Sequence, residues 1–322
     1  MNNEIINTAL ENLRDFPGIE GHWNPDGPLN GILQLNIQKN QYTFLVKTFN
    51  EFRGHNLISL DEMKVNEPVI LVANHILPKV KKELQLKNIP YIEKNGNIFL
   101  KQDNTYLLVD TNKPAATERK TGNRAFTKTG LKVVFHLLTH KEDINLPQRQ
   151  LAEKTGVALG NIPQVIEGLK ETGYLIPLKK GHYLWEKRKE LLERWINEYD
   201  TVLKPKLSKE RYTFQGNFRD IRLNHALTVW GGEPAADMLT NYLRPEKYML
   251  YTKENRKNLM KNYRLVPQKD GEIEALEMFW NNPDNQITAP PMLVYADLLL
   301  EGGKRNIKTA EKIFNEYIEP NL

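Results

Sequence analysis

The side chains best suited to chemistry in this sequence lie on residues 161–170, and they could recognise DNA. Asn161, Gln164 and Lys170 are polar members of a segment whose apolar residues recur at helical spacing. Asparagine and glutamine can each form two hydrogen bonds with adenine in the major groove. The first turn of a recognition helix is the part that reaches the bases. We therefore predict a recognition helix here, with these three side chains on its outer surface.

Basic side chains around this helix could contact phosphates, which position a protein on DNA. The predicted phosphate contacts are Lys132, Arg149, Lys179, Lys180 and His182, with Arg119, Lys120, Arg124 and Lys128 of the polar stretch 113–128. That stretch also contains Lys113 and a single acid, Glu118. It either lies along phosphates or is a solvated linker. Glu167 shares the outer face of the helix and is expected to repel the DNA backbone and lower affinity.

Three short helices and a hairpin must position these residues. The apolar residues that indicate the helices are Leu131, Val134, Phe135 and Leu138, then Leu151 and Ala152, then Ile162, Val165, Ile166 and Leu169. Pro147 favours the start of the second helix, while Gly156 and Gly173 favour the ends of the second and third. Residues 174–177 and 182–185 resemble two strands around a basic turn. Three helices followed by a hairpin predict a winged helix-turn-helix over residues 113–200. The alternative is that this fold serves only for contacts with other proteins.

Residues 1–112 predict a mixed α/β domain. A helix is expected over residues 4–14, and a turn region rich in glycine and proline over residues 17–31. Strands are expected at 33–37, 42–46, 69–73, 91–92, 98–100 and 106–109, with a helix over 78–86. Strand, helix and strand at this spacing are typical of a βαβ unit in a mixed sheet.

This first domain resembles the PD-(D/E)xK nucleases, in which acids hold a metal ion and a lysine supports the attacking water. Asp26 precedes the first strand pair, and Lys47 ends its second strand. Leu45 occupies the position of the second acid and cannot bind a metal, which leaves Glu51 as a substitute. We predict a restriction-endonuclease-like scaffold that has lost its activity. The alternatives are a metal-dependent nuclease that uses Asp26, Lys47 and Glu51, and an unrelated α/β domain with a surface lysine.

Residues 201–322 predict a second α/β domain, after a charged helix over 186–199. Strands are expected at 211–214, 248–251 and 273–276, and helices from Pro234, over 292–300 and over 309–318. The complete prediction is therefore a nuclease-like α/β domain, a winged helix-turn-helix and a C-terminal α/β domain.

Composition excludes several kinds of site. The chain has 322 residues, a formal net charge of +5 and no cysteine, so disulfides and thiolate metal sites are ruled out. His136 and His140 are four residues apart, but His136 adjoins the apolar face of its predicted helix, and we predict neither a metal nor a cofactor. The N-terminal segment has no long apolar run, so neither a signal peptide nor a membrane span is expected, and we expect a cytoplasmic protein. A single winged helix of this modest charge is expected to need a second copy, as in a homodimer, or the basic stretch 113–128 to hold DNA.

Four segments resemble one known family. They are YIEKNGNIFL at residues 91–100, WGGEPAA at 230–236, YMLYT at 248–252 and LVYADLL at 293–299. The sequence is similar in these segments to the AbiEi-type antitoxins of type IV toxin–antitoxin systems. The chain differs from the simplest antitoxins in its additional first domain and its central winged helix.

The resemblance implies a winged-helix transcriptional regulator that binds double-stranded operator DNA and represses its own operon. It also implies a nucleotidyltransferase-like toxin encoded beside it, which the antitoxin opposes without a stable complex. The leading hypothesis is thus a DNA-binding regulator without enzymatic activity. The alternatives are the nuclease described above and a protein-interaction scaffold that binds no DNA.

Overall fold

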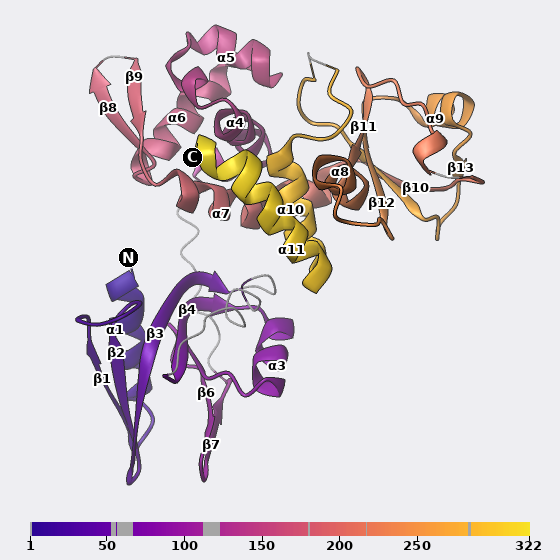
Figure 1. Ribbon diagram of the computed structural model, residues 1–322. Coiled ribbons are helices and arrows are strands. Elements are labelled where there is room, and N and C mark those ends of the chain that lie inside the picture. Colours follow the sequence, from indigo (N-terminus) through magenta and orange to yellow (C-terminus); the bar gives the residue numbers. More distant parts are fainter. Residues whose placement is uncertain are drawn as a thin grey trace. The chain divides into compact units, whose positions relative to one another are not determined.

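The structure is a computed structural model, and it describes residues 2–52, 56, 67–111, 123–179, 181–216, 218–282 and 285–322 (Figure 1). The chain divides into two compact units, Met1–Arg119 and Lys120–Leu322. Both units combine helices with a sheet, so the expected mixed α/β class is confirmed. No helix in the described residues is long and apolar enough to span a membrane.

The first unit is built on a seven-stranded sheet whose strands are ordered as in the sequence. The strands pair antiparallel except β3 with β4 and β4 with β5, which are parallel. A helix between β4 and β5 supplies the crossover that parallel neighbours need. The elements are α1 (Asn2–Leu13), β1 (Ile19–Asn24), β2 (Ile32–Ile37), β3 (Asn40–Phe52), β4 (Val69–Ile76), α3 (Pro78–Leu86), β5 (Tyr91–Glu93), β6 (Ile98–Gln102) and β7 (Thr105–Val109).

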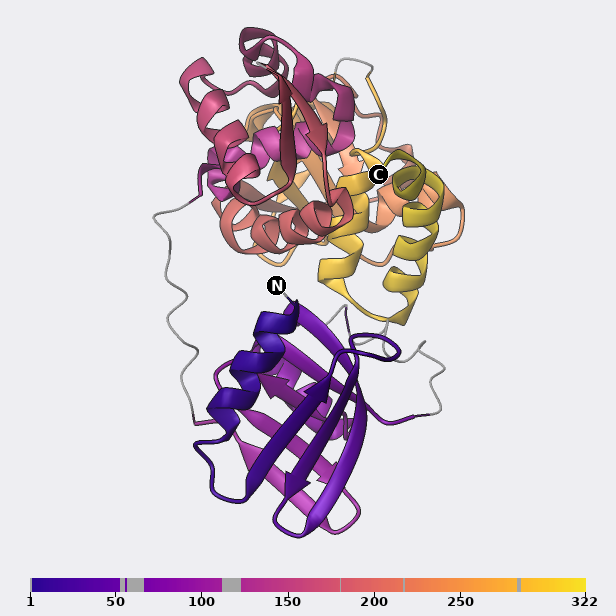
Figure 2. The same cartoon turned by 90° about the vertical axis from the view of Figure 1, so that its left-hand side faces the viewer.

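Alternation along the strands gives this sheet two apolar faces. Helix α1 lies along one face, where Ile6 and Leu13 pack with Leu35 and Val46 (Figure 2). Helix α3 covers the other face, where its residue Leu84 packs in a second cluster with strand residues such as Leu71, Tyr91 and Phe99. Because both faces are buried, the central strands are apolar runs, as the sequence indicated for β4.

The prediction of a turn region over residues 17–31 is wrong in its first part, because Ile19–Asn24 forms the edge strand β1. It pairs antiparallel with β2, and Gly21 lies opposite Leu35. A Cβ atom on Gly21 would lie 2.5 Å from a methyl group of Leu10, so glycine is what lets α1 pack over this strand. The alternation of apolar and polar residues along β1 could not be seen in the sequence, because the inward position 21 is a glycine and has no side chain.

Glu93, at the end of β5, is 1% exposed and is held by three donors. Its carboxylate lies 2.6 Å from the Lys81 ammonium and accepts hydrogen bonds from Asn97 Nδ2 and from the Ile76 backbone N–H, each at 2.8 Å. His75 Nδ1 lies 3.4 Å away. Burial alone would raise the pKa of Glu93, but these bonds outweigh it and lower the pKa to about 2. The cluster joins β4, α3 and β5.

The low pKa makes the first unit sensitive to acid. A carboxyl group whose folded pKa is about 2, below its ordinary value of 4.5, stabilises the fold above about pH 4.5, and this contribution is lost as the pH falls toward 2. We expect Glu93→Gln to lower the free energy of unfolding at pH 7 by about 3 kcal/mol. The difference in this free energy between the variant and the unchanged chain should disappear near pH 2. Urea unfolding followed by the methyl NMR signals of Leu71 and Val72 measures it. Glu20→Gln, at an exposed site, is the control; an undiminished pH dependence in Glu93→Gln would contradict the assignment.

The second unit begins with helices and a hairpin. They are η1 (Arg124–Phe126), α4 (Lys128–Thr139), η2 (Lys141–Asn145), α5 (Gln148–Thr155), η3 (Leu159–Asn161), α6 (Ile162–Glu171), β8 (Leu175–Lys179) and β9 (His182–Trp185). All the apolar residues that predicted the three helices are buried. Gly156 ends α5 in the left-handed conformation with φ 65°, as expected for a helix stop.

The rest of this unit carries a five-stranded sheet in the order β11-β12-β14-β10-β13, in which β12 and β14 are parallel. Its elements are α7 (Arg188–Glu198), η4 (Tyr199–Leu203), η5 (Lys204–Lys206), β10 (Lys209–Thr213), η6 (Phe218–Asp220), β11 (Thr228–Gly231), α8 (Gly232–Thr240), β12 (Tyr248–Thr252), α9 (Arg256–Tyr263), β13 (Val266–Pro267), β14 (Ile273–Glu277), α10 (Pro291–Glu301), α11 (Lys304–Ile313), η7 (Phe314–Ile318) and η8 (Glu319–Asn321).

Among the strands and α-helices of this list, β11, α9 and β13 were not predicted. All four residues of β11 are buried, so the strand shows no alternation. In α9, Leu259 and Tyr263 are the buried residues, which is too weak a helical period to detect. The third, β13, is two residues long and is defined by its pairing with β10.

One hydrophobic core runs through the whole second unit. The ring of Phe135 in α4 lies 5.0 Å from that of Phe279 and 5.9 Å from that of Trp280, both beyond β14. Trp195 of α7 donates a hydrogen bond to the Leu131 carbonyl at 2.9 Å, and its ring stacks on Tyr199 at 5.0 Å. The boundary predicted near residue 200 therefore falls inside one compact unit.

The segment at residues 230–236 connects several elements of this unit through hydrogen bonds. Gly232 has φ 48°, and the carboxylate of Glu233, 5% exposed, accepts hydrogen bonds from the Glu246 backbone N–H at 2.6 Å and from Asn306 at 3.1 Å. Glu233 thus fastens the start of α8 to the segment before β12 and to α11. Part of the family-like segment at residues 230–236 is therefore explained by the contacts that Glu233 makes within this unit.

Candidate nucleic-acid interface

Helix α6 separates apolar from polar residues along its length. Ile162, Val165 and Leu169 are at most 1% exposed and face α4 and α5. Gln164 and Glu167 are exposed on the opposite side. Gln164 is the third residue of the helix, so its side chain projects from the first turn, as predicted.

Lys170 and Glu167, expected to act in opposite ways on DNA, form an ion pair with each other. Lys170 Nζ donates to Glu167 Oε2 at 2.7 Å, three residues apart on α6. This hydrogen bond raises the pKa of Lys170 above its ordinary value. Lys170 is therefore held by Glu167, and the repulsion expected from Glu167 is partly offset.

Three predicted residues are brought together at one end of α6. Arg124, Lys128 and Asn161 border a polar hollow of about 250 Å³, and Lys206 completes it. Lys128 Nζ donates to the Lys206 carbonyl at 3.2 Å, which fixes η5 beside the start of α4. Lys206 was not among the predicted contacts, although the Lys-Pro-Lys segment at residues 204–206 is a basic signal in the sequence.

Asn123 holds the segment 123–126 beside α6. Its amide group donates to the Gly168 carbonyl of α6 at 2.7 Å and accepts from the Ala125 backbone N–H at 2.9 Å. A Cβ atom on Gly168 would lie 2.2 Å from the Asn123 side-chain oxygen, so glycine is required there. The predicted residues Lys113, Arg119 and Lys120 of the same stretch lie outside the described residues.

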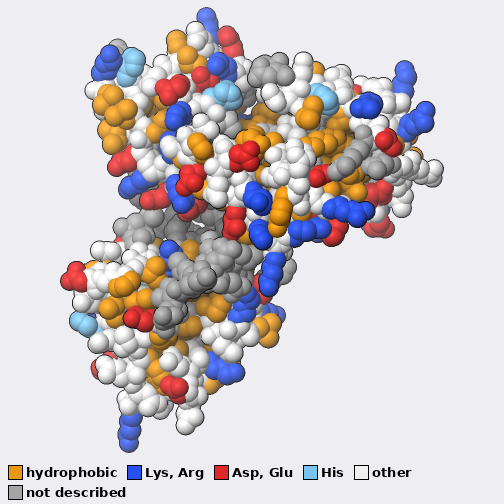
Figure 3. Space-filling view, in the orientation of Figure 1, with side chains coloured by type: hydrophobic (Ala, Val, Ile, Leu, Met, Phe, Trp, Pro, Cys, Tyr) orange, Lys and Arg blue, Asp and Glu red, His pale blue; other side chains and the backbone are white. Residues whose placement is uncertain are grey.

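The remaining predicted contacts are distributed over other elements. Arg149 is exposed on α5, and Lys179 and His182 are exposed on the hairpin; Lys180, between them, lies outside the described residues. Basic and histidine side chains gather at the tip of the hairpin, above an apolar flank (Figure 3). Lys132 is not brought together with them, because it lies 3.8 Å from Glu277 at the end of β14.

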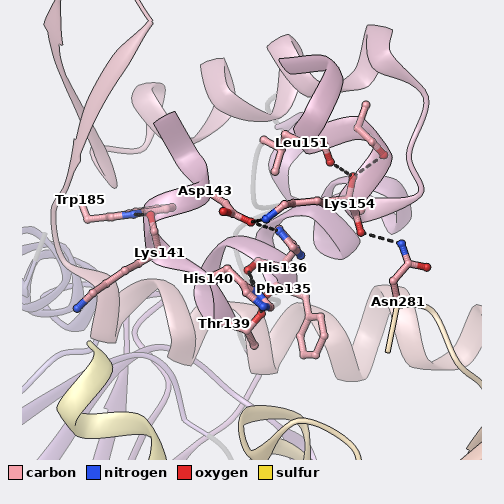
Figure 4. Close-up of polar contacts among 12 residues, drawn as sticks. Phe135, His136, Thr139, His140, Lys141, Asp143, Leu151, Lys154, Trp185 and Asn281 are labelled. Atoms are coloured by element: carbon pink, nitrogen blue, oxygen red, sulfur yellow. Dashed lines mark hydrogen bonds and ion pairs between the residues drawn. The ribbon is translucent and has the colours of Figure 1, made fainter. Parts of the chain in front are cut away.

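A polar network fixes α5 against α4, and Figure 4 shows His136 and Lys154 both directed at Asp143. Asp143 Oδ2 lies 2.7 Å from His136 Nε2 and 2.9 Å from Lys154 Nζ. Burial would raise the pKa of Asp143, but its bonds to Lys154 and His136 lower it; burial lowers the pKa of His136. Asn281 donates to the Lys154 carbonyl at 2.9 Å, so the network extends to the segment beyond β14.

Of the residues predicted for nuclease chemistry, the structure describes the side chains of Asp26 and Lys47. Asp26 is exposed in the loop after β1. Lys47 is half-buried in β3 and, by alternation with Val46, projects from the face that α3 covers. The side chain of Glu51 lies outside the described part of the structure. Within the described residues, no group of three histidine or acidic side chains could hold a metal ion.

Comparison with known proteins identifies part of the chain. Residues 184–319 match the family described as "Transcriptional regulator, AbiEi antitoxin, Type IV TA system". The resemblance seen in the sequence is thus confirmed for these residues, which run from β9 to the start of η8. This part of the chain is therefore similar to a family whose members are described as transcriptional regulators and antitoxins. No match was found among curated proteins or solved structures.

Asp143 offers a test of how the three helices are held. In Asp143→Ala, His136 and Lys154 lose their common acceptor, so we expect the free energy of unfolding at pH 7 to fall by about 1–2 kcal/mol. Urea unfolding followed by tryptophan fluorescence suits this unit, which contains Trp185, Trp195, Trp230 and Trp280. Glu153→Ala, at an exposed neighbour on α5, should leave the transition unchanged. Equal midpoints for both variants would show that the network does not stabilise the unit.

Proposed function

We propose that this protein is a DNA-binding transcriptional regulator of the antitoxin type, and that residues 124–185 form a winged helix-turn-helix. In this proposal α6 is the recognition helix and the β8–β9 hairpin is the wing. The observation that supports it best is α6 itself, whose apolar side is buried while Gln164 projects from its exposed first turn. A helix of this kind can enter the major groove with its N-terminal residues on the bases.

Gln164 is the proposed base-reading residue. Its amide group can donate to and accept from one adenine at the same time, which a single charged group cannot do. Asn161 is half-buried beside Arg124 and Lys128, so we assign it to the edge of the interface. Lys170 is assigned a supporting role, since Glu167 holds its ammonium group.

Cations flank the helix where a DNA backbone would pass. Arg124, Lys128 and Lys206 lie at one end, and we propose that they bind phosphate on one strand. Arg149 on α5 and the exposed wing residues Lys179 and His182 are proposed to bind phosphate further along the duplex. Lys132 is left out of the interface, because it faces Glu277.

The family match supports the biological part of the proposal. We infer that the DNA is an operator upstream of the chain's own operon, and that a nucleotidyltransferase-like toxin encoded nearby is opposed without a stable complex. We also infer a homodimer on DNA, because so few cations per copy give weak binding and two copies can share a symmetric operator. The first unit is proposed to be a nuclease-like scaffold without activity.

The first test is DNA binding as a function of salt. The five proposed cations of each copy, besides His182, should make log K per bound copy fall with log salt at a slope of about −4 to −5. Lys206→Gln should weaken binding to all duplexes alike and reduce the slope by about 1, whereas Gln164→Ala should cost about 1–3 kcal/mol on the upstream duplex and little on a random one. Fluorescence anisotropy with both labelled duplexes measures this. Exposed Lys269→Gln is the control, and binding independent of salt would refute the proposal.

The ion pair on α6 gives a second test with the opposite sign. Glu167→Gln removes a negative charge from the DNA-facing side and frees Lys170, so DNA affinity should rise by about two- to fivefold at low salt. The gain should shrink at high salt, because exposed charges are screened. Glu171→Gln, near the end of the same helix, serves as the matched control. Unchanged or weaker binding by Glu167→Gln would place this face of α6 away from DNA.

A further inference from the structure

A hollow of about 490 Å³ lies at the foot of the hairpin, and the DNA-binding proposal makes no use of it. Residues of η2, of β9 and of the start of α7 surround it. Its volume lies in the range of small-molecule sites in proteins. The hollow combines two features that point to an anionic ligand: an enclosed arginine and a ring of lysines.

Arg188, the first residue of α7, borders this hollow and is 7% exposed. One of its terminal nitrogens, Nη2, donates to the Leu138 carbonyl at 2.9 Å. Its Nε and Nη1 are shut off from solvent and meet no acceptor within the described part of the chain. Burial holds the pKa of this guanidinium below its ordinary value. Buried donors are normally hydrogen-bonded, so these two nitrogens, which have no acceptor in the described residues, need an explanation.

The surroundings of Arg188 are cationic and aromatic. Lys141, Lys187 and Lys189 also border the hollow, and the acid that lines it is Glu142. The Arg188 guanidinium lies 5.1 Å from the centre of the Trp185 ring, which helps to hold the cation in place. Lys187 keeps its backbone in the left-handed region at φ 52°, an uncommon conformation for a residue other than glycine. Three lysines and an arginine around one acid leave the site with excess positive charge.

We propose that this hollow binds a small phosphate-bearing anion of about the size of a mononucleotide. A turn of the Arg188 side chain toward the hollow would let its planar guanidinium meet two phosphate oxygens at once, and the lysines can neutralise the remaining charge. Tyr183, half-buried on the wall, offers an aromatic surface for a base. A DNA backbone is a poorer occupant, because Arg188 is enclosed rather than displayed on the surface. The proposal does not depend on DNA binding.

Calorimetric titration of the full chain, without DNA, tests the site with three probes: AMP, inorganic phosphate and adenosine. AMP should bind with a dissociation constant below about 1 mM, phosphate more weakly, and adenosine not measurably. Arg188→Lys should weaken AMP binding by about tenfold or more, because lysine lacks the planar pair of donors. The double variant Lys141→Gln, Lys187→Gln changes surface residues and should weaken it by about three- to tenfold.

Lys269→Gln, exposed and remote in sequence from the hollow, should bind AMP as the unchanged chain does. Near-ultraviolet circular dichroism of each variant separates lost binding from lost folding, and the surface double variant keeps the test valid if Arg188→Lys unfolds. No heat with AMP, equal binding of adenosine and AMP, or undiminished binding in the double variant would each overturn the proposal. Displacement of AMP by a random DNA duplex would also overturn it, because the cations would then belong to the DNA-binding surface.

Discussion

The second unit depends on the packing of aromatic rings from α4 and α7 against rings that follow β14. Phe135 contacts Phe279 and Trp280, and Trp195 joins them through Phe135 and Tyr199. Buried rings of this size remove much apolar surface from water and tolerate little displacement. The three helices before β8 and the five-stranded sheet after it therefore form one cooperative body.

The buried carboxylates Asp297, Glu93 and Glu233 are matched by hydrogen-bond donors, whereas several cations at the proposed interface, such as Arg149 and Lys179, are exposed. Asp297 accepts hydrogen bonds from Tyr251 at 2.7 Å and from Lys204 at 3.0 Å, and Glu93 and Glu233 are similarly surrounded by donors. Breaking such groups is costly, since a lone carboxylate would remain in the interior. Arg188 differs from these carboxylates, because two of its buried nitrogens meet no acceptor in the described part of the chain. Exposed lysines and arginines contribute little to stability and remain free to serve binding.

Much of the fold could be predicted because many of its helices and strands have a clear apolar period. The three helices around α6 follow from residues such as Leu131, Leu151 and Val165, all buried as expected. Strand β1 could not be predicted in this way, because the Gly21 position has no side chain to show the alternation. The candidate site was predicted in part: Gln164 lies where the helical period places it, but the pairing of Lys170 with Glu167 depends on side-chain conformation. Lys206 joins the site only through tertiary contacts, since it is 78 residues from Lys128.

The sequence by itself determined most of the element types, the mixed α/β class and the resemblance of the C-terminal part to the antitoxin family. These follow from local patterns and motifs, which need no knowledge of distant contacts. The tertiary structure decided which charges are free and which are held: Lys132 lies near Glu277, Lys170 is bonded to Glu167, and two enclosed nitrogens of Arg188 meet no acceptor in the part of the chain that the structure describes. It also decided that α4–α6 and the C-terminal sheet share one core. The physical reason is that charge pairing and core continuity depend on distances through space, and residues far apart in sequence set those distances.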